Sequence, residues 1–198
     1  MKLRIISVKS KDKRASLLQL KALSPEENKE YQYIVSEGTY REIGCPLSGE
    51  ILEDEESVRI ISEDERRRAF SKLLRILEYA DNNLFRTRQK LKAAGFGKDA
   101  TDYALKEALR YGYINEKRQL SVKIEALANR KLLGPNRIGA KLSAEGYSRA
   151  DIRDVLEELV SDGVVDFEKN KETLLEKLCP DGFEEKRKIL YKYGFWND

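Results

Sequence analysis

The sequence predicts a mainly α protein, with tandem three-helix repeats (two complete, a third truncated) in an elongated array preceded by a small antiparallel β module. A leucine-x-x-x-glycine-aromatic motif occurs at residues 91–96, 142–147 and 190–195. The first two copies lie 51 residues apart, and the same offset places Leu105 on Leu156 and Gly112 on Gly163. A period of this length indicates a tandem array of small supersecondary units.

These repeats divide the chain into four expected segments. An N-terminal β-rich accessory module covers residues 1–61, and the first three-helix repeat covers 62–115. The second repeat covers 116–165, and the truncated third repeat covers 166–198, which has no residues left for a third helix.

The N-terminal module is expected to contain short antiparallel strands. Residues 3–8, 16–23 and 31–35 are rich in aliphatic, aromatic and β-branched side chains, which favour strands. Residues 37–38 suggest a turn into a further short segment at 40–43. After this segment, Gly44, Pro46 and Gly49 disrupt regular structure.

Three helices are expected in the first repeat. The first begins at Ser62, because Ser62 and Glu65 have the spacing of a capping box. The second carries Leu91 and ends at Gly95, where a left-handed residue is favoured. The third covers residues 98–111, and its expected inward positions are Ala104, Leu105, Ala108 and Leu109.

The second and third repeats follow the same scheme. Residues 116–129 form a first helix, a second begins after Gly134, and a third begins after Ser148 with Asp151 in its capping box. The third repeat has helices at about 167–178 and 183–193. Aromatic residues at the repeat junctions are expected in the core, as is a tryptophan near the end of the chain: Tyr111, Tyr113 and Trp196.

The composition argues against an enzyme. The chain has no histidine, which removes the usual general base and the commonest metal ligand, and it has no phosphate-binding loop motif. Cys45 and Cys179 lack the spacing of a metal site, so we expect free thiols. We therefore expect no catalytic residues, no metal and no cofactor.

No apolar stretch approaches the roughly 20 residues of a membrane-spanning helix, and the N-terminus lacks a signal-peptide core. A cytoplasmic protein without membrane contact is expected.

Positive charge is concentrated in the two complete repeats. Residues 66–165 carry 21 Lys and Arg against 13 Asp and Glu, whereas residues 1–65 carry 10 against 14. Basic domains favour polyanions or acidic protein surfaces as partners.

Three features make the chain resemble the RecX family of cytosolic bacterial regulators of the RecA recombinase. These are the triplicated glycine motif, the link Tyr-Gly-Tyr-Ile-Asn-Glu-Lys-Arg at residues 111–118, and Gly-Pro-Asn-Arg-Ile at 134–138. The resemblance covers residues 63–195 and implies curved tandem repeats that bind RecA in the groove of its DNA filament. It also implies slower filament growth, ATP hydrolysis and strand exchange in recombination, DNA repair and the SOS response. The N-terminal strands and the missing last helix depart from the family pattern.

The candidate contacts to the RecA–DNA filament are basic residues of the first two repeats. Residues four apart share a helix face, so Arg88 pairs with Lys92 and Arg137 with Lys141. The full candidate set is Arg66, Lys72, Arg75, Arg88, Lys92, Arg118, Lys123, Arg130, Lys131, Arg137 and Lys141.

Two alternatives remain open beside a RecA-binding monomer. The helical units could contact DNA directly, and since their polar faces are poor in Asn and Gln, such binding would be weak and independent of sequence. A hydrolase or nuclease would need a carboxylate metal site. Four acidic residues lie close in sequence but read better as an exposed helix face: Asp151, Asp154, Glu157 and Glu158.

Overall fold

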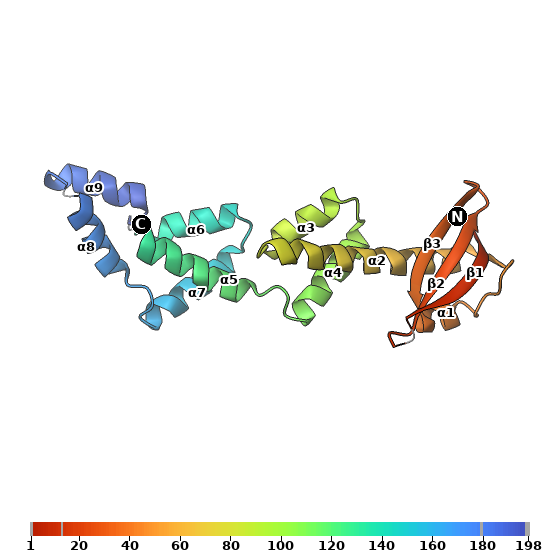
Figure 1. Ribbon diagram of the computed structural model, residues 1–198. Coiled ribbons are helices and arrows are strands. Elements are labelled where there is room, and N and C mark those ends of the chain that lie inside the picture. The colour runs from red at the N-terminus through yellow and green to blue at the C-terminus, as the bar shows by residue number, and fades with distance from the viewer. Residues whose placement is uncertain (1, 13, 179, 197–198) are drawn as a thin grey trace. The chain divides into compact units, whose positions relative to one another are not determined.

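The computed structural model describes residues 2–12, 14–178 and 180–196 (Figure 1). The chain divides into two compact units. The first comprises Met1–Glu78 and Lys90–Tyr111, and the second comprises Tyr79–Gln89 and Gly112–Asp198.

A four-stranded antiparallel sheet begins the first unit. Its strands are β1 (Leu3–Asp12), β2 (Leu17–Ser24), β3 (Lys29–Ser36) and β4 (Ile51–Leu52), in the order β3-β2-β1-β4. The three predicted strands are confirmed. The alternating side chains that bury one face include Leu3, Ile5, Leu20, Ala22 and Val35.

Residues 37–42 form a short helix, α1 (Glu37–Glu42), where we had expected a turn leading into a further short segment. Ser36 is its N-cap, and the Ser36 hydroxyl accepts a hydrogen bond from the Thr39 amide at 3.1 Å. This local cap satisfies a free amide and favours the helix.

The next helix, α2 (Asp54–Tyr79), begins well before Ser62, so the predicted start was wrong. Its first turn carries three acidic residues, which suit the positive helix end. The carboxylate of Glu56 accepts a hydrogen bond from the Glu53 amide at 2.9 Å. Ile60, fully buried in the core of the sheet, explains why the helix extends this far back. The predicted partner of Ser62, Glu65, instead accepts from the Gly97 amide at 2.8 Å.

The C-terminal half of α2 belongs with α3 (Leu84–Ala93), which enters the first unit at Lys90, and α4 (Lys98–Arg110). Leu73, Leu91 and Ala104 are fully buried here. Gly95 has φ +88° after α3, as the motif predicts. Leu109 is 48% exposed, so its predicted inward position was wrong.

In the second unit, α5 (Glu116–Glu125) continues into a π-helical turn, η1 (Ala126–Arg130), within the predicted first helix of the repeat. It is followed by α6 (Pro135–Ala144) and α7 (Arg149–Ser161). The Ser148 hydroxyl caps α7 by accepting from the Asp151 amide, as predicted. α7 packs against both α5 and α6 around a shared core of Leu120, Ile124, Ile138, Leu142, Ile152, Val155 and Leu159.

Two helices follow, α8 (Phe167–Leu178) and α9 (Gly182–Tyr193), in agreement with the predicted ranges. The end of α9 is fixed to the start of α6. The Gly134 amide donates to the Tyr193 carbonyl at 2.8 Å, and the Asn136 side chain donates to the Trp196 carbonyl at 2.9 Å. A Cβ on Gly134 would overlap the Gly194 carbonyl, so glycine permits this close approach.

Candidate interaction surfaces

One basic surface of the first unit lies along α2. Four of its cations line a cleft of about 250 Å³ beside Ile34 and Asp64: Arg67, Arg68, Lys72 and Arg75. The Asp64 carboxylate accepts from the Ile34 amide at 2.9 Å and from Arg68 Nε at 2.7 Å. Glu63 also pairs with Arg67, at 3.4 Å, so two carboxylates stand against four cations and the cleft has an excess of positive charge. We call these four residues the α2 basic face.

Arg66 is held elsewhere on α2. Its guanidinium is ion-paired with Asp99 at 2.7 Å and lies 5.7 Å from the centre of the Tyr103 ring. The hydrogen bond from Arg66 keeps the pKa of the Asp99 carboxyl below its usual range. Of the predicted site residues in α2, Lys72 and Arg75 thus lie together, whereas Arg66 joins α2 to α4.

The second unit exposes five of the predicted cations. Within the part of the chain that the structure describes, none of them forms an ion pair: Arg118, Arg130, Lys131, Arg137 and Lys141. On α3, Lys92 is exposed and Arg88 is half-buried. Lys123 differs from the five exposed cations of this unit, because its ammonium is paired with Glu145 and lies 5.4 Å from the centre of the Tyr147 ring.

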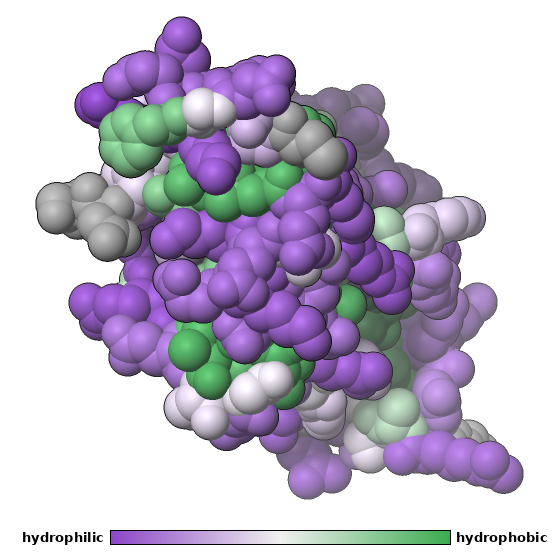
Figure 2. All heavy atoms as spheres, turned by 90° about the vertical axis from the view of Figure 1, so that its left-hand side faces the viewer, coloured by the Kyte–Doolittle hydropathy of each residue, from purple (hydrophilic) through white to green (hydrophobic). Residues whose placement is uncertain are grey.

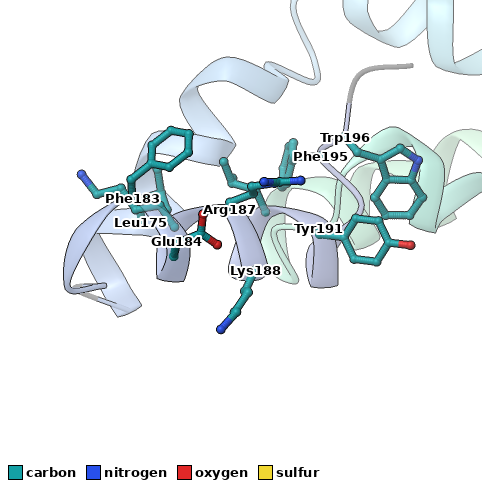
Figure 3. A pocket seen from close by; sticks show the side chains of 10 residues that line it. Leu175, Phe183, Glu184, Arg187, Lys188, Tyr191, Phe195 and Trp196 are labelled. Atoms are coloured by element: carbon teal, nitrogen blue, oxygen red, sulfur yellow. The ribbon is translucent and has the colours of Figure 1, made fainter.

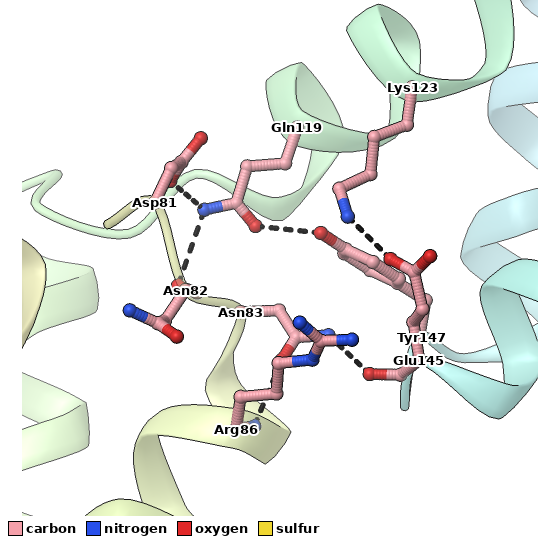
Figure 4. Close-up of polar contacts among 8 residues, drawn as sticks. All are labelled: Asp81, Asn82, Asn83, Arg86, Gln119, Lys123, Glu145 and Tyr147. Carbon is pink, nitrogen blue, oxygen red and sulfur yellow. Dashed lines mark hydrogen bonds and ion pairs between the residues drawn. The ribbon is translucent and has the colours of Figure 1, made fainter. Parts of the chain in front are cut away.

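Lys123 belongs to a polar network that sequence reasoning missed (Figure 4). Gln119 is its centre: the side-chain amide donates to Asp81 and to the Asn82 carbonyl, and its oxygen accepts from the Tyr147 hydroxyl at 3.1 Å. Asn83 donates to the Glu145 carbonyl at 3.0 Å. Burial raises the pKa of Tyr147 to about 12, so its hydroxyl remains a donor. The network fixes the segment before α3 to α5 and to the end of α6.

Glu116 makes a second such link. Its carboxylate accepts from the Leu84 amide at 2.9 Å and so caps α3. Burial raises the pKa of Glu116, and this effect outweighs the backbone hydrogen bond that lowers it.

The junction aromatics are more exposed than expected. Tyr111 and Tyr113 are 56% and 53% exposed, so their predicted core positions were wrong. The Arg110 guanidinium lies 4.2 Å from the centre of the Tyr111 ring. Trp196 is 37% exposed, and its ring lies beside that of Tyr191 in a tilted arrangement with 4.8 Å between ring centres, so it does not close a core.

Cys45 is a free, exposed thiol, and Cys179 lies outside the described residues. Within the described ranges, no group of three His, Cys, Asp or Glu residues is placed to hold a metal ion. In the acidic part of α7, Glu158 pairs with Lys117 at 2.8 Å.

No protein-family model matches the sequence, and no curated protein matches it significantly. The solved structures that resemble the fold include two structures of RecX. A crystal structure of the regulatory protein RecX has a TM-score of 0.63 at 18% identity, covering 96% of this chain and 91% of that chain. A crystal structure of RecX from Lactobacillus salivarius has a TM-score of 0.56 at 20% identity, covering 67% and 90%. The chain therefore has a RecX-like fold. Among the described residues, no helix is long and apolar enough to cross a membrane.

Proposed function

We propose that this chain, with its RecX-like fold, is a regulatory protein that binds the RecA recombinase and its filament on DNA. The expected effect is a lower ATPase rate, slower filament growth and less strand exchange during recombination and DNA repair. The observation that supports this proposal most strongly is the fold itself, which resembles a RecX structure over 96% of the chain.

The charges of the helical surfaces support the same proposal. The α2 basic face belongs to the first unit, and the five exposed cations described above belong to the second. A recombinase filament is polyanionic through its DNA, and Lys and Arg attract phosphate and acidic side chains over a range that salt shortens. Among the eleven candidate residues, Arg66 and Lys123 are the least suited to direct contact, because both are committed to internal ion pairs.

The test is a titration of the cognate recombinase's single-strand-dependent ATPase with the wild-type chain and two quadruple variants. The first variant reverses exposed candidate cations from both units: Lys72→Glu, Arg75→Glu, Lys131→Glu and Lys141→Glu. The second is a charge-matched control that reverses exposed cations outside the candidate set: Lys9→Glu, Lys106→Glu, Arg149→Glu and Lys169→Glu. Both variants change the net charge by the same amount.

We expect the wild type and the control to inhibit the ATPase alike. At least about tenfold more of the first variant should be needed for the same inhibition, because several charge contacts are lost together. Equal inhibition by both variants would contradict the assignment of the contact residues. The absence of any effect on ATPase, with the wild type at saturation, would overturn the proposed function.

A second candidate is direct, sequence-independent contact with single-stranded DNA. It is favoured by the exposed rings of Tyr103 and Tyr111 on the first unit, because exposed aromatic side chains stack on bases. Anisotropy of a labelled oligonucleotide, measured without recombinase, tests it. If this function dominates, binding occurs without RecA and falls steeply as salt rises.

We further propose that the chain acts as a monomer in the cytoplasm, without catalytic activity of its own. The RecX-like fold, a regulatory rather than an enzymatic one, supports this proposal.

A further inference from the structure

The segment formed by α8 and α9 leaves an open apolar groove of about 820 Å³. We call the partly buried lining residues Leu175, Leu190 and Phe195 its floor, and the exposed residues Phe183, Tyr191 and Trp196 its rim. Figure 3 shows the groove from close by. Phe183 is 76% exposed and Tyr191 is 67% exposed. Figure 2 faces this end of the chain and shows hydrophobic surface open to solvent among hydrophilic residues.

The preceding repeat shows what fills the corresponding position. The 51-residue offset places Leu175 on Ile124. The second and third copies of the glycine motif lie 48 residues apart, which places Leu190 on Leu142 and Phe195 on Tyr147. In that repeat the three counterparts are 0%, 0% and 5% exposed, and all three belong to the core that includes α7. The floor of the groove therefore corresponds to the surface that α7 covers with Ile152, Val155 and Leu159.

The α7 helix also indicates which side chains a helix needs in order to cover such a surface. Its three buried side chains follow an i, i+3, i+7 pattern, which is the pattern by which an amphipathic helix binds an apolar groove. Its charged residues are mainly acidic, with Asp151, Asp154, Glu157 and Glu158 against two arginines.

The rim of the groove has the opposite charge. Lys186, Arg187 and Lys188 line it against the single carboxylate of Glu184. In Figure 3, Arg187 extends along the groove toward Phe195, while Lys188 points away from the aromatic rings. An acidic amphipathic helix thus matches the groove in apolar character and is opposite to it in charge.

We propose that the α8–α9 groove is a docking site for an acidic amphipathic helix of a partner protein, with apolar side chains at i, i+3 and i+7. The helix lies where α7 lies in the preceding repeat and completes the third three-helix unit. Phe183 and Tyr191 supply apolar contact area, and Lys186 and Arg187 pair with carboxylates on the partner helix. This site is distinct from the basic surfaces of the proposed function and does not depend on them.

The test uses the full chain and a synthetic peptide of residues 149–161, labelled with fluorescein and capped at both ends. Peptide anisotropy reports binding. Trp196 reports the location, because it is the only tryptophan of the chain, it lines the groove, and the peptide contains none. A scrambled peptide of the same composition keeps the charge and removes the apolar stripe.

We expect saturable binding of the α7 peptide, a blue shift of the Trp196 emission, and binding at least about tenfold weaker for the scrambled peptide. Phe183→Asp and the pair Lys186→Glu with Arg187→Glu should each weaken binding about tenfold or more, since the first removes apolar contact and the second reverses the rim charge. Tyr79→Asp, at a side chain that is 90% exposed outside the groove, should leave binding unchanged.

Three outcomes would overturn the proposal. One is equal binding of the two peptides, and another is binding that Phe183→Asp leaves intact. The third is self-association of the chain that Phe183→Asp abolishes, which would assign the groove to a second copy. Because Phe183 is exposed, the variant should fold, and an unchanged melting temperature would verify this.

Discussion

The α5–α7 segment, which is the predicted second repeat, and the α8–α9 segment place similar side chains in different surroundings. Leu142 and Tyr147 of the repeat are 0% and 5% exposed, whereas their counterparts Leu190 and Phe195 are only partly buried. The sequences are alike in the motif itself, so the motif does not decide burial. The leucine is fully buried where a third helix follows, at Leu91 and Leu142, and α7 supplies apolar cover over Leu142 that α8 and α9 lack over Leu190.

The largest expected difference concerns the shared leucine. Leu142→Ala should lower the free energy of unfolding by about 2–5 kcal/mol, since it leaves a cavity in a closed core. Leu190→Ala should cost only about 1 kcal/mol, because that side chain is already partly hydrated. Urea unfolding of both variants measures the difference. Equal costs would mean that the α8–α9 segment is as tightly packed as the complete repeat.

The motif glycines give a second contrast. Gly95 and Gly146 both have positive φ, at +88° and +96°, so alanine at either costs about 1–2 kcal/mol of backbone strain. At Gly146 a Cβ would also overlap the ring of Phe85, whereas at Gly95 nothing lies within 4 Å.

We therefore expect Gly146→Ala to destabilise the chain clearly more than Gly95→Ala in thermal unfolding. Phe85→Ala in the Gly146→Ala background separates the two causes. It should recover part of the loss if the overlap matters, and none if only backbone strain does.

A smaller effect is expected at the motif aromatics. Tyr147→Phe removes the hydroxyl that donates to Gln119 and leaves a buried acceptor unsatisfied, at a cost of about 1 kcal/mol. Phe195→Tyr, at the open counterpart, should change stability by less than about 0.5 kcal/mol, since a new hydroxyl there reaches solvent. Melting temperatures of the two variants test this, and a large loss for Phe195→Tyr would show that the groove is closed.

The smallest effect is a pH dependence that only the complete repeat should show. The pKa of Glu116 is raised in the folded chain, so the folded state binds more protons than the unfolded state just above the ordinary Glu pKa. Stability then falls as the pH rises through that window and stays lower above it. The residue 51 positions later, at the start of α8, is Phe167, which has no ionisable group.

Glu116→Gln keeps an acceptor for the Leu84 amide and removes the charge. The difference in melting temperature between Glu116→Gln and the wild type should therefore grow as the pH rises from about 4 to 7. A difference that is constant across this range would show that the ionisation of Glu116 is unaffected by folding.

Local signals predicted much of the fold. The motif glycines end helices because their φ values are positive, and Ser148 starts α7 because its hydroxyl reaches the Asp151 amide. Both depend on residues only a few positions apart. The start of α2 was misplaced because Ser62 has the local form of a cap, while the burial of Ile60 against the sheet extends the helix. That contact depends on residues distant in sequence.

The candidate site shows the same division. Helix spacing identified exposed cations such as Lys72 and Lys141. It gave no sign that Arg66 pairs with Asp99, 33 residues away, or that Lys123 pairs with Glu145, 22 residues away. Charge counting treats all of these cations alike, and only the tertiary structure separates the paired side chains from the others.

The long α2 helix has a mechanical consequence. Its 26 residues form a rod about 39 Å long, with the core of the sheet at one end and the first repeat's helices at the other. A rod of this kind transmits torsion. A single alanine inserted near Ser62 would turn the sheet by about 100° relative to the C-terminal half of α2, while seven inserted residues would restore the phase to within about 20°. The rotational setting of the sheet against the first repeat is thus fixed by the residue count of one helix.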